Sequence, residues 1–279
     1  MAEKLITSPA NPIIKDIKAL EMRKRRKETG LFLVEGLRSV IEGMECGATL
    51  KYIAYHTDIK QKDDVKRCVS YCNKCDGLAL EVNDIVLEKI SRKDNPQSVI
   101  GVFEQKTLSI KNIDIQSFSN KNDTSRCIVA LEQVRDPGNL GTIIRTIDAV
   151  GAEAVILIGQ CCDPYSIEAV RATMGSLFSV PIYQATLEEF KGWAKGWQEK
   201  TDGDILGTTL QTSVDFRDVK PKSPIILMMG NEQAGLSEDL RQIATSCIRL
   251  PMNGRADSLN LSVATGICLY ALLEPWTSK

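Results

Sequence analysis

The chain has 279 residues, of which 43% are hydrophobic and 25% are charged. This length indicates one large domain or two modest ones, and we expect two; the composition is that of a globular protein and excludes a mainly disordered chain. The formal net charge is −1, so an anionic partner would have to meet a local basic patch.

The sequence predicts a cytoplasmic protein with no membrane partner. No apolar run approaches the roughly 20 residues that a membrane helix needs, and the N-terminal residues contain no apolar signal-peptide core. Nine cysteines in such a chain indicate reduced thiols and not a disulfide framework.

Strand and helix patterns alternate over the first part of the chain. An apolar stripe predicts a helix over 13–27, which ends in the basic run RKRRK, and a short apolar run predicts a buried strand over 31–34. Further helices are expected over 36–43, 62–72 and 82–90, and further strands at KYIAY, LALEV and SVIGVFEQ. The alternation predicts a compact α/β domain over 1–105.

The first thirty residues carry a local excess of positive charge. They contain eight basic and four acidic side chains, a balance of +4. Five of the basic residues are consecutive: Arg23, Lys24, Arg25, Arg26 and Lys27. This run either contacts the phosphates of an anionic partner or is a solvated helix end.

A linker is predicted over 106–124, because the polar stretch SIKNIDIQSFSNKNDTS lacks a long apolar period. A second α/β domain follows over 125–279. Its strands are expected over 127–132 and 154–158 and at DILGTT and IILMMG, and its helices over 139–150, 167–178, 236–244 and 260–273, with the apolar piece IRLPM between the last two. This alternation predicts a mostly parallel sheet covered by helices on both faces, with ligands at the carboxyl ends of its strands.

The first motif, EQVRDPGNLG, joins the strand over 127–132 to the next helix through a Pro-Gly turn. Asn139 can cap this helix. The buried stripe of the helix is formed by Leu140, Ile143, Ile144 and Ile147. Arg145 lies off this stripe, so it faces a site or is a solvated arginine on an ordinary helix. The Gly-x-x-Gly spacing does not match a dinucleotide fingerprint, which argues against a nicotinamide-dependent oxidoreductase.

The second motif, GNEQAG, follows the strongest predicted strand. Gly230 would let a ligand approach the backbone, and free amides at the start of the following helix could bind a polar group. The alternative is a tight turn between strand and helix.

The third motif, PMNGRADSLNLS, combines a polar, glycine-containing loop with Ser258, Asn260 and Ser262 in alternation with apolar residues. Such side chains cap helices, but three in alternation exceed what capping needs. The pattern therefore favours a site.

Two other sequence patterns contain residue types that bind metals or catalyse hydrolysis. Cys68, Cys72 and Cys75 have the spacing of an iron–sulfur ligand set, but the first two lie on an ordinary predicted helix, and a zinc site would need Cys46 or His56 as its fourth ligand. We expect structural thiols and no metal. Because His56 is the single histidine and lies at a predicted strand end, a hydrolytic triad is not favoured either.

Taken together, the three motifs resemble those of the SpoU/TrmH family of RNA ribose 2′-O-methyltransferases, in the SPOUT class. The resemblance lies in the order, spacing and residues of NLGTIIRTIDAVGA, IILMMGNEQAGLS and IRLPMNGRADSLNLSVATGICLYAL. The segments SPANPIIKDIKAL and RRKETGLFLVEGLRSVIEG resemble the substrate-binding domain that precedes many of these enzymes. The likeness covers most of the chain and departs at Ser98, where relatives usually have glycine.

This resemblance implies the fold class, which is an α/β catalytic domain over 125–279 with a deep trefoil knot and a parallel sheet covered by helices. It also implies a smaller α/β RNA substrate-binding domain over 1–105, similar to ribosomal protein L30e. The cofactor would be S-adenosylmethionine, and the protein would be a homodimer. The implied cofactor-binding residues are Thr208, Gly230, Leu250, Met252 and Leu259.

The implied catalytic residues are Asn139, Arg145, Glu232, Ser258 and Asn260. Arg145 would lie at the ribose hydroxyl; since arginine stays protonated, holding a phosphate and stabilising the developing alkoxide is an easier role for it than general base. Asn139 would orient Arg145 or the ribose, and Glu232 would fix the loop of the second motif. Ser258 and Asn260 would hold the target nucleotide.

The implied substrate is ribosomal RNA of the 23S type. The added N-terminal domain resembles those of rRNA enzymes, and the basic run over 23–27 would bind a folded stem-loop through its phosphates. A tRNA 2′-O-methyltransferase and a non-catalytic RNA-binding ribosome-assembly factor are the alternatives. The complete set of motif residues argues against the second alternative.

Overall fold

The computed structural model describes residues 3–91, 97–119, 126–212 and 214–273. The chain divides into two compact units. The N-terminal unit contains residues 1–106 and 163–179, and the C-terminal unit contains residues 107–162 and 180–279.

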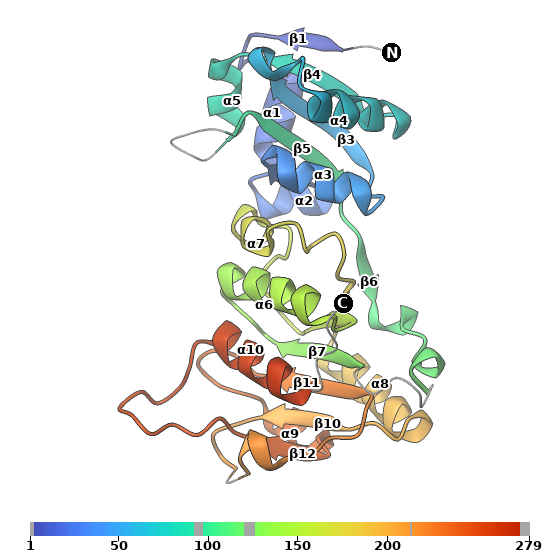
Figure 1. The fold of residues 1–279 in the computed structure, drawn as a ribbon, viewed down its shortest axis with the longest axis vertical. Coiled ribbons are helices and arrows are strands. Elements are labelled where there is room, and N and C mark those ends of the chain that lie inside the picture. Colours follow the sequence, from blue (N-terminus) through green and yellow to red (C-terminus); the bar gives the residue numbers. More distant parts are fainter. Residues whose placement is uncertain (1–2, 92–96, 120–125, 213, 274–279) are drawn as a thin grey trace. The chain divides into compact units, whose positions relative to one another are not determined.

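The N-terminal unit is built on a five-stranded sheet in the order β1-β4-β3-β5-β2 (Figure 1). Its strands are β1 (Lys4–Ile6), β2 (Leu31–Glu35), β3 (Leu50–His56), β4 (Leu78–Val82) and β5 (Val99–Glu104). Its helices are α1 (Pro12–Ala19), α2 (Arg23–Thr29), α3 (Leu37–Glu45), α4 (Asp63–Lys74), α5 (Asp84–Ile90) and α7 (Ile167–Thr173), with the 3-10 turn η1 (Thr57–Ile59). Strand β5 runs antiparallel to both of its neighbours, and the other pairs are parallel. The predicted mixed α/β fold is confirmed.

The single helix predicted over 13–27 is wrong, because the chain forms α1 and α2 with a turn between them. Asn11 caps α1 with a side-chain hydrogen bond of 2.9 Å. The guanidinium of Arg26 donates to the carbonyl oxygens of Leu20 and Glu21, both at 2.8 Å. These carbonyls lie at the break between the helices, so one buried cation replaces the helical hydrogen bonds that are lost there.

The segment 163–179 packs into the N-terminal unit, although the sequence pattern placed it within the second domain. Ile167, at the start of α7, is buried in the apolar core of the N-terminal unit. The ring of Phe178 lies 4.8 Å from that of Phe103. Two ion pairs also hold the segment: Arg26 with Asp163, and Arg171 with Glu35. The prediction of an uninterrupted domain over 125–279 is therefore wrong. The segment 163–179 belongs to the N-terminal unit because its apolar and charged partners lie there.

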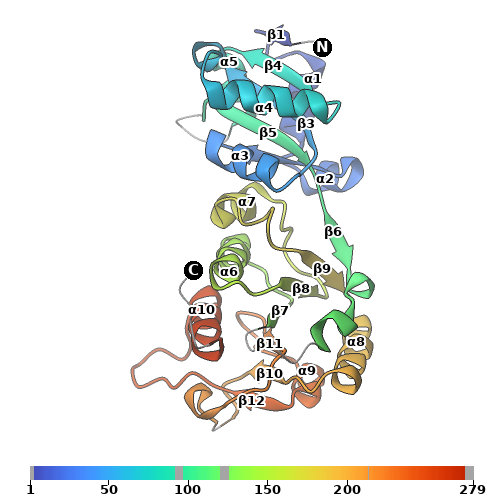
Figure 2. The same cartoon turned by 45° about the vertical axis from the view of Figure 1, so that its right-hand side comes forward.

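The C-terminal unit is built on a seven-stranded sheet in the order β12-β10-β11-β7-β8-β9-β6, in which all pairs are parallel (Figure 2). Its strands are β6 (Thr107–Ser109), β7 (Cys127–Glu132), β8 (Ala154–Ile158), β9 (Ile182–Ala185), β10 (Ile205–Thr208), β11 (Ile225–Met229) and β12 (Ser246–Ile248). Its helices are α6 (Pro137–Val150), α8 (Leu187–Lys200), α9 (Glu238–Ile243) and α10 (Leu261–Leu272), with the 3-10 turns η2 (Ile110–Asn112), η3 (Ile115–Ser119) and η4 (Phe216–Asp218). Helices α6 and α10 cover one face of the sheet, and α8 and α9 cover the other (Figure 2). The predicted parallel sheet with two covered faces is confirmed.

The core of the C-terminal unit lies at the centre of this sheet. All residues of β7, β8 and β11 are buried, as expected for parallel strands with a helix layer on each side. On the side of α8, Trp193 and Trp197 fill the core with their rings 5.3 Å apart. Such a rigid sheet fixes the positions of the loops that leave the carboxyl ends of its strands.

The linker predicted over 106–124 is wrong for the part that the structure describes, 106–119. Strand β6 pairs with β9 at the edge of the C-terminal sheet. Ile110 and Phe118 are 1% and 6% exposed, so this segment contributes to the core. Its apolar residues are separated by short 3-10 turns and have no helical period, which is why the sequence pattern did not reveal them. Residues 120–124 lie outside the described residues.

The helices of the described ranges are short, with 14 residues in the two longest, α6 and α8. Within those ranges, no helix is long and apolar enough to cross a membrane.

Candidate active site

Four adjacent strands of the C-terminal sheet end at one edge, and all three motifs begin there. Strands β12, β10, β11 and β7 are neighbours and parallel, so their carboxyl ends lie side by side. The first motif follows β7, the second follows β11 and the third follows β12, while Thr208 is the last residue of β10. The strand order therefore places the three motifs at one site, as the general rule for ligands of open parallel sheets predicts.

A cavity of about 650 Å³ opens at this edge. The residues lining it include all those that the resemblance implied for the cofactor, which are Thr208, Gly230, Leu250, Met252 and Leu259. They also include four of the implied catalytic residues, which are Asn139, Glu232, Ser258 and Asn260. We refer to this space below as the cofactor cavity.

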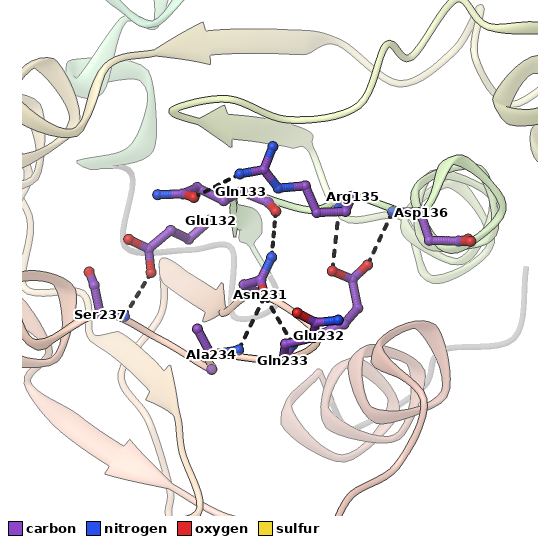
Figure 3. Close-up of a pocket in the computed structure, with 10 residues that line it drawn as sticks. Glu132, Gln133, Arg135, Asp136, Asn231, Glu232, Gln233, Ala234 and Ser237 are labelled. Atoms are coloured by element: carbon purple, nitrogen blue, oxygen red, sulfur yellow. Dashed lines mark hydrogen bonds between the residues drawn. The ribbon is translucent and has the colours of Figure 1, made fainter.

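Glu232 joins the second motif to the first (Figure 3). Its Oε2 accepts a hydrogen bond from the backbone amide of Arg135 at 3.3 Å. Its Oε1 accepts from the backbone amide of Asp136 and from the side-chain amide of Asn139, both at 3.4 Å. The carboxylate thus lies at the start of α6, where the helix dipole and free amides favour a negative charge.

Asp136, and not Asn139, caps α6. The Asp136 carboxylate accepts from the amide of Asn139 at 2.6 Å, and Pro137 occupies the first turn. The cap expected at Asn139 is therefore wrong, although an Asp followed by Pro is itself a signal for a helix start. Because Asp136 performs the capping, the Asn139 side chain is left for the site, where its Oδ1 accepts from Nδ2 of Asn260 at 2.8 Å.

Asn260 combines a structural and a site contact. Its Oδ1 caps α10 by accepting from the amides of Ser262 at 2.9 Å and Val263 at 3.3 Å, and from the Ser262 hydroxyl at 2.6 Å. Its Nδ2 donates to Asn139. Glu232, Asn139 and Asn260 therefore form one hydrogen-bonded chain, and this chain links all three motifs.

The tight turn that was the alternative for the second motif is present at Gly230. A Cβ at this position would lie 2.1 Å from the carbonyl carbon of Gly235 and 2.1 Å from the amide nitrogen of Leu236. Two backbone hydrogen bonds between Asn231 and Gly235, of 3.0 and 2.9 Å, close the turn. Glycine at 230 is thus required by the turn, which also forms a wall of the cofactor cavity.

Two implied catalytic residues lie outside this hydrogen-bonded chain. Ser258 is exposed and lines the cofactor cavity, and the described part of the structure shows no hydrogen bond of its hydroxyl. Arg145 lies on the exposed side of α6 and does not line the cavity. Among the described residues, no carboxylate pairs with the guanidinium of Arg145. Both side chains are therefore available to an external ligand.

The basic run of α2 is only partly available to RNA. Arg26 is 4% exposed, and its guanidinium donates to Oδ2 of Asp163 at 2.9 and 2.7 Å. The assignment of Arg26 to RNA is therefore corrected to a buried ion pair, because its donors are used within the N-terminal unit. The other members are exposed or half-buried: Arg23, Lys24, Arg25 and Lys27.

The cysteines of α4 are structural. Cys68 and Cys72 are buried, and desolvation raises the pKa of Cys68 to about 11 and that of Cys72 to about 12. Thiols of this kind stay protonated at neutral pH and are poor nucleophiles and metal ligands. In the ranges that the structure describes, no three His, Cys, Asp or Glu side chains are grouped so as to hold a metal ion.

Comparisons with known proteins match nearly the whole chain. Residues 126–270 match the SpoU rRNA Methylase family, and residues 11–101 match the MRM3-like substrate binding domain. The 23S rRNA (guanosine(2553)-2′-O)-methyltransferase RlmP of Bacillus subtilis is 29% identical over 96% of this chain and 99% of its own length. The 23S rRNA (uridine(2479)-2′-O)-methyltransferase of Streptomyces viridochromogenes is 30% identical over 89% of this chain and 84% of its own length.

A solved structure extends this likeness to the fold. The AdoMet-bound rRNA methyltransferase from Sinorhizobium meliloti is 44% identical to this chain, with a TM-score of 0.85 over 96% of each chain. Both units of the present chain thus have counterparts in one solved protein.

Proposed function

The chain belongs to the SpoU rRNA methylase family, and we propose that it transfers a methyl group from S-adenosylmethionine to a ribose 2′-hydroxyl of ribosomal RNA. The observation that carries the proposal is the hydrogen-bonded chain of Glu232, Asn139 and Asn260 beside the cofactor cavity. Two relatives are named as 23S rRNA 2′-O-methyltransferases, which supports RNA of the 23S type as the substrate.

The lining of the cofactor cavity suits S-adenosylmethionine, the ligand named for the S. meliloti relative. Leu250, Met252 and Leu259 offer apolar surface to an adenine ring, and Thr208 adds a hydroxyl at the end of β10. Polar and apolar side chains share the lining, and about 650 Å³ lies within the range of roughly 300 to 1,000 Å³ that is typical of small-molecule sites. When bound, S-adenosylmethionine supplies a methyl group activated by a positively charged sulfur.

The task of the protein side chains is to position the RNA. Transfer requires the ribose oxygen in line with the methyl group and the removal of a weakly acidic proton. A guanidinium is a poor general base, so we assign to Arg145 the phosphate beside the target ribose and the negative charge that develops on the oxygen. The Asn139 amide, fixed by Glu232 on one side and Asn260 on the other, orients the ribose or Arg145. The unpaired hydroxyl of Ser258 holds the target nucleotide.

We propose that the two domains have different roles. The N-terminal unit binds the RNA substrate, and the C-terminal unit carries the catalytic site. The match to a substrate binding domain over 11–101 supports this division, as do the exposed cations Arg23, Lys24 and Lys27 on α2.

We further propose a homodimer that forms through α10. Val263, Ile267 and Tyr270 are 49%, 38% and 51% exposed and lie at i, i+4 and i+7, on one face of this helix. An apolar stripe of this kind on a surface helix is typical of a protein interface. We also propose that the protein acts in the cytoplasm and that the loops that follow β11 and β12 form the trefoil knot that the resemblance to the SPOUT class implies.

Methylation in vitro tests the proposed function. Purified protein is incubated with S-adenosylmethionine and unmodified transcripts of ribosomal and transfer RNA, and the nucleosides are identified by mass spectrometry. We expect one 2′-O-methylnucleoside in large-subunit rRNA and none in tRNA. Methylation of tRNA alone would favour the tRNA enzyme, and RNA binding without methylation would favour the assembly factor.

A further inference from the structure

A second pocket lies beside the cofactor cavity, at the carboxyl ends of β7 and β11 (Figure 3). It has a volume of about 440 Å³ and shares with the cofactor cavity the turn over 231–235, which separates the two spaces. The proposed methyl transfer uses the cofactor cavity and gives no role to Glu132 or Gln133, which line the second pocket. We call this space the Glu132 pocket.

Glu132 places a nearly buried carboxylate at the wall of this pocket. It is the last residue of β7 and is 5% exposed. Its Oε2 accepts a hydrogen bond from the amide of Ser237 at 2.7 Å (Figure 3). Among the described residues, neither a cation nor a second donor reaches this carboxylate, although a buried ionised group normally has several. Its remaining lone pairs are therefore open to donors of a ligand in the pocket.

The residue after Glu132 holds a strained backbone. Gln133 has φ of +48°, a region that disfavours side chains other than those of Gly, Asn and Asp. Asn231 stabilises this conformation, because its Nδ2 donates to the Gln133 carbonyl at 2.8 Å. Strain of this kind persists mainly where the side chain is used by a site, since glycine would relieve it.

Arg135 is a cation in the lining of the pocket, which also includes the carboxylates of Glu132, Asp136 and Glu232. Its guanidinium donates to Oε1 of Gln133 at 3.2 Å, which holds the two side chains together (Figure 3). A planar guanidinium stacks on aromatic rings and attracts phosphate. The pocket thus combines a buried acceptor, a cation with a flat face, and the side-chain amides of Gln133 and Gln233.

We propose that the Glu132 pocket binds a guanine base of the substrate RNA. The Glu132 carboxylate accepts hydrogen bonds from the N1–H and the N2 amino group of guanine, and Arg135 stacks on the ring. This inference rests on the proposed action on RNA and adds the identity of a recognised base.

The number of adjacent donors selects guanine over the other bases. Guanine offers two neighbouring N–H donors on its pairing edge, which match the two oxygens of a carboxylate. Adenine and cytosine offer one exocyclic amino group beside an unprotonated ring nitrogen, and that nitrogen faces the second oxygen unfavourably. Uracil offers one N–H between two carbonyl oxygens, which the carboxylate repels. A bidentate contact of this type distinguishes bases strongly.

Binding of short RNA tests the inference independently of methyl transfer. The probes are the fluorescently labelled pentanucleotides UUGUU, UUIUU with inosine, and UUUUU, titrated with the full-length protein in the presence of S-adenosylmethionine. Inosine lacks only the N2 amino group, so it removes one of the two donors. We expect UUGUU to bind roughly tenfold more tightly than UUIUU, and UUUUU to bind most weakly. Equal affinities for UUGUU and UUIUU in the wild-type protein would overturn the inference.

Glu132→Gln assigns the preference to this residue. Glutamine keeps the size of the side chain and an oxygen for the Ser237 amide, but it replaces one acceptor by a donor. We expect the guanine preference to fall below twofold while the affinity for UUUUU stays unchanged. Asp239→Asn is the matched control. It removes a carboxylate that lies two residues beyond Ser237 and does not line the pocket. A preference that survives in Glu132→Gln would overturn the inference.

The guanine preference and the methylation of rRNA are measured independently of each other. If the protein methylates rRNA but shows no preference for guanosine over inosine, the pocket assignment is wrong and the enzymatic function stands. If the preference depends on Glu132 but no RNA is methylated, the pocket assignment stands and the enzymatic function is wrong. The wild-type comparison between UUGUU and UUIUU decides the inference even if Glu132→Gln does not fold.

Discussion

Ser258 and Asn260 separate the contribution of a site residue to catalysis from its contribution to stability. Asn260→Ala removes the cap of α10 and the contact with Asn139, so we expect a loss of ~0.5 to 2 kcal/mol in the free energy of unfolding together with slower methylation. Ser258→Ala breaks no hydrogen bond among the described residues. We expect an unchanged melting temperature and turnover reduced roughly 100-fold, the usual effect of a misplaced reactant. Thermal melts beside single-turnover methylation measure both quantities.

Ser262→Ala is the matched control for these two variants. Its hydroxyl contacts Asn260 at the same helix start but does not line the cofactor cavity. We expect a small loss of stability and near-normal turnover. Turnover in Ser258→Ala as high as in this control would remove Ser258 from the catalytic residues.

Arg145→Ala tests the role of the unpaired guanidinium on α6. Because Arg145 does not line the cofactor cavity, we expect methyl transfer to be abolished while the affinity for S-adenosylmethionine stays within a few-fold of wild type. Calorimetric titration measures the affinity. Arg145→Lys keeps the charge but loses the planar pair of donors, so it should remain well below wild-type activity. Loss of cofactor binding in Arg145→Ala would place this residue in the cofactor cavity and contradict its assignment to RNA.

Single residues also show the limits of prediction from sequence. The residues that the resemblance implied for the cofactor lie around one cavity, because each motif follows a strand of one parallel sheet. The cap of α6 was assigned to Asn139 and belongs to Asp136, since both types accept hydrogen bonds at a helix start. The buried state of Arg26 was not predictable, because its partner Asp163 lies far away in the sequence.

Helix α2 contains cations with two different roles. Neutralising the exposed Arg23, Lys24 and Lys27 together should flatten the slope of log affinity for rRNA against log salt by roughly two units, at ~0.7 to 0.9 per phosphate contact. Fluorescence anisotropy at a series of salt concentrations measures the slope. An unchanged slope would mean that α2 is a solvated helix and that RNA contacts other elements.

Arg26→Ala should act on stability instead of RNA binding. It leaves the carboxylate of Asp163 without its cation and the carbonyls of Leu20 and Glu21 without a donor, so we expect a loss of roughly 3 kcal/mol. Chemical denaturation measures this loss, and the salt slope of the variant serves as the internal control. A normal denaturation midpoint would contradict the structural role of Arg26.

Elements with a clear hydrophobic pattern were predicted well, and elements without such a pattern were not. Strands such as β7 and β11 appear as short, continuous apolar runs, which parallel strands with two covered faces require. The helix expected over 13–27 was wrong because the clear apolar period of α1 ends at Leu20 and gives no sign of the break that precedes the basic run of α2. The prediction of a linker over 106–119 was wrong for the opposite reason, because β6 and the 3-10 turns that follow it are too short to show any apolar period.

The feature of the whole molecule that was least predictable from sequence is the path of the chain, which returns to the N-terminal unit for one segment. The segment 163–179 belongs to the N-terminal unit although the residues on both sides of it belong to the C-terminal unit. Its place depends on contacts with distant residues such as Glu35 and Phe103, and no local pattern encodes such contacts.

Ile267→Asp tests the proposed homodimer. The substitution places a charge in the apolar stripe of α10 but outside the buried core, so we expect a folded monomer where the wild-type protein is a dimer. Sedimentation equilibrium gives the mass, and circular dichroism confirms folding. Thr142→Asp, on the exposed side of α6, is a control for added surface charge. A dimer that persists in Ile267→Asp would move the interface away from this stripe.

If the protein methylates a ribose 2′-hydroxyl of ribosomal RNA, cells that lack it lose one modified nucleoside. Nucleosides from purified rRNA and tRNA of a deletion strain are compared by mass spectrometry with those of the parent and of strains that carry the wild-type or the Arg145→Ala gene. We predict that one 2′-O-methylnucleoside disappears from large-subunit rRNA and returns with the wild-type gene but not with Arg145→Ala. An rRNA methylation pattern identical in the deletion strain and its parent would contradict the claim.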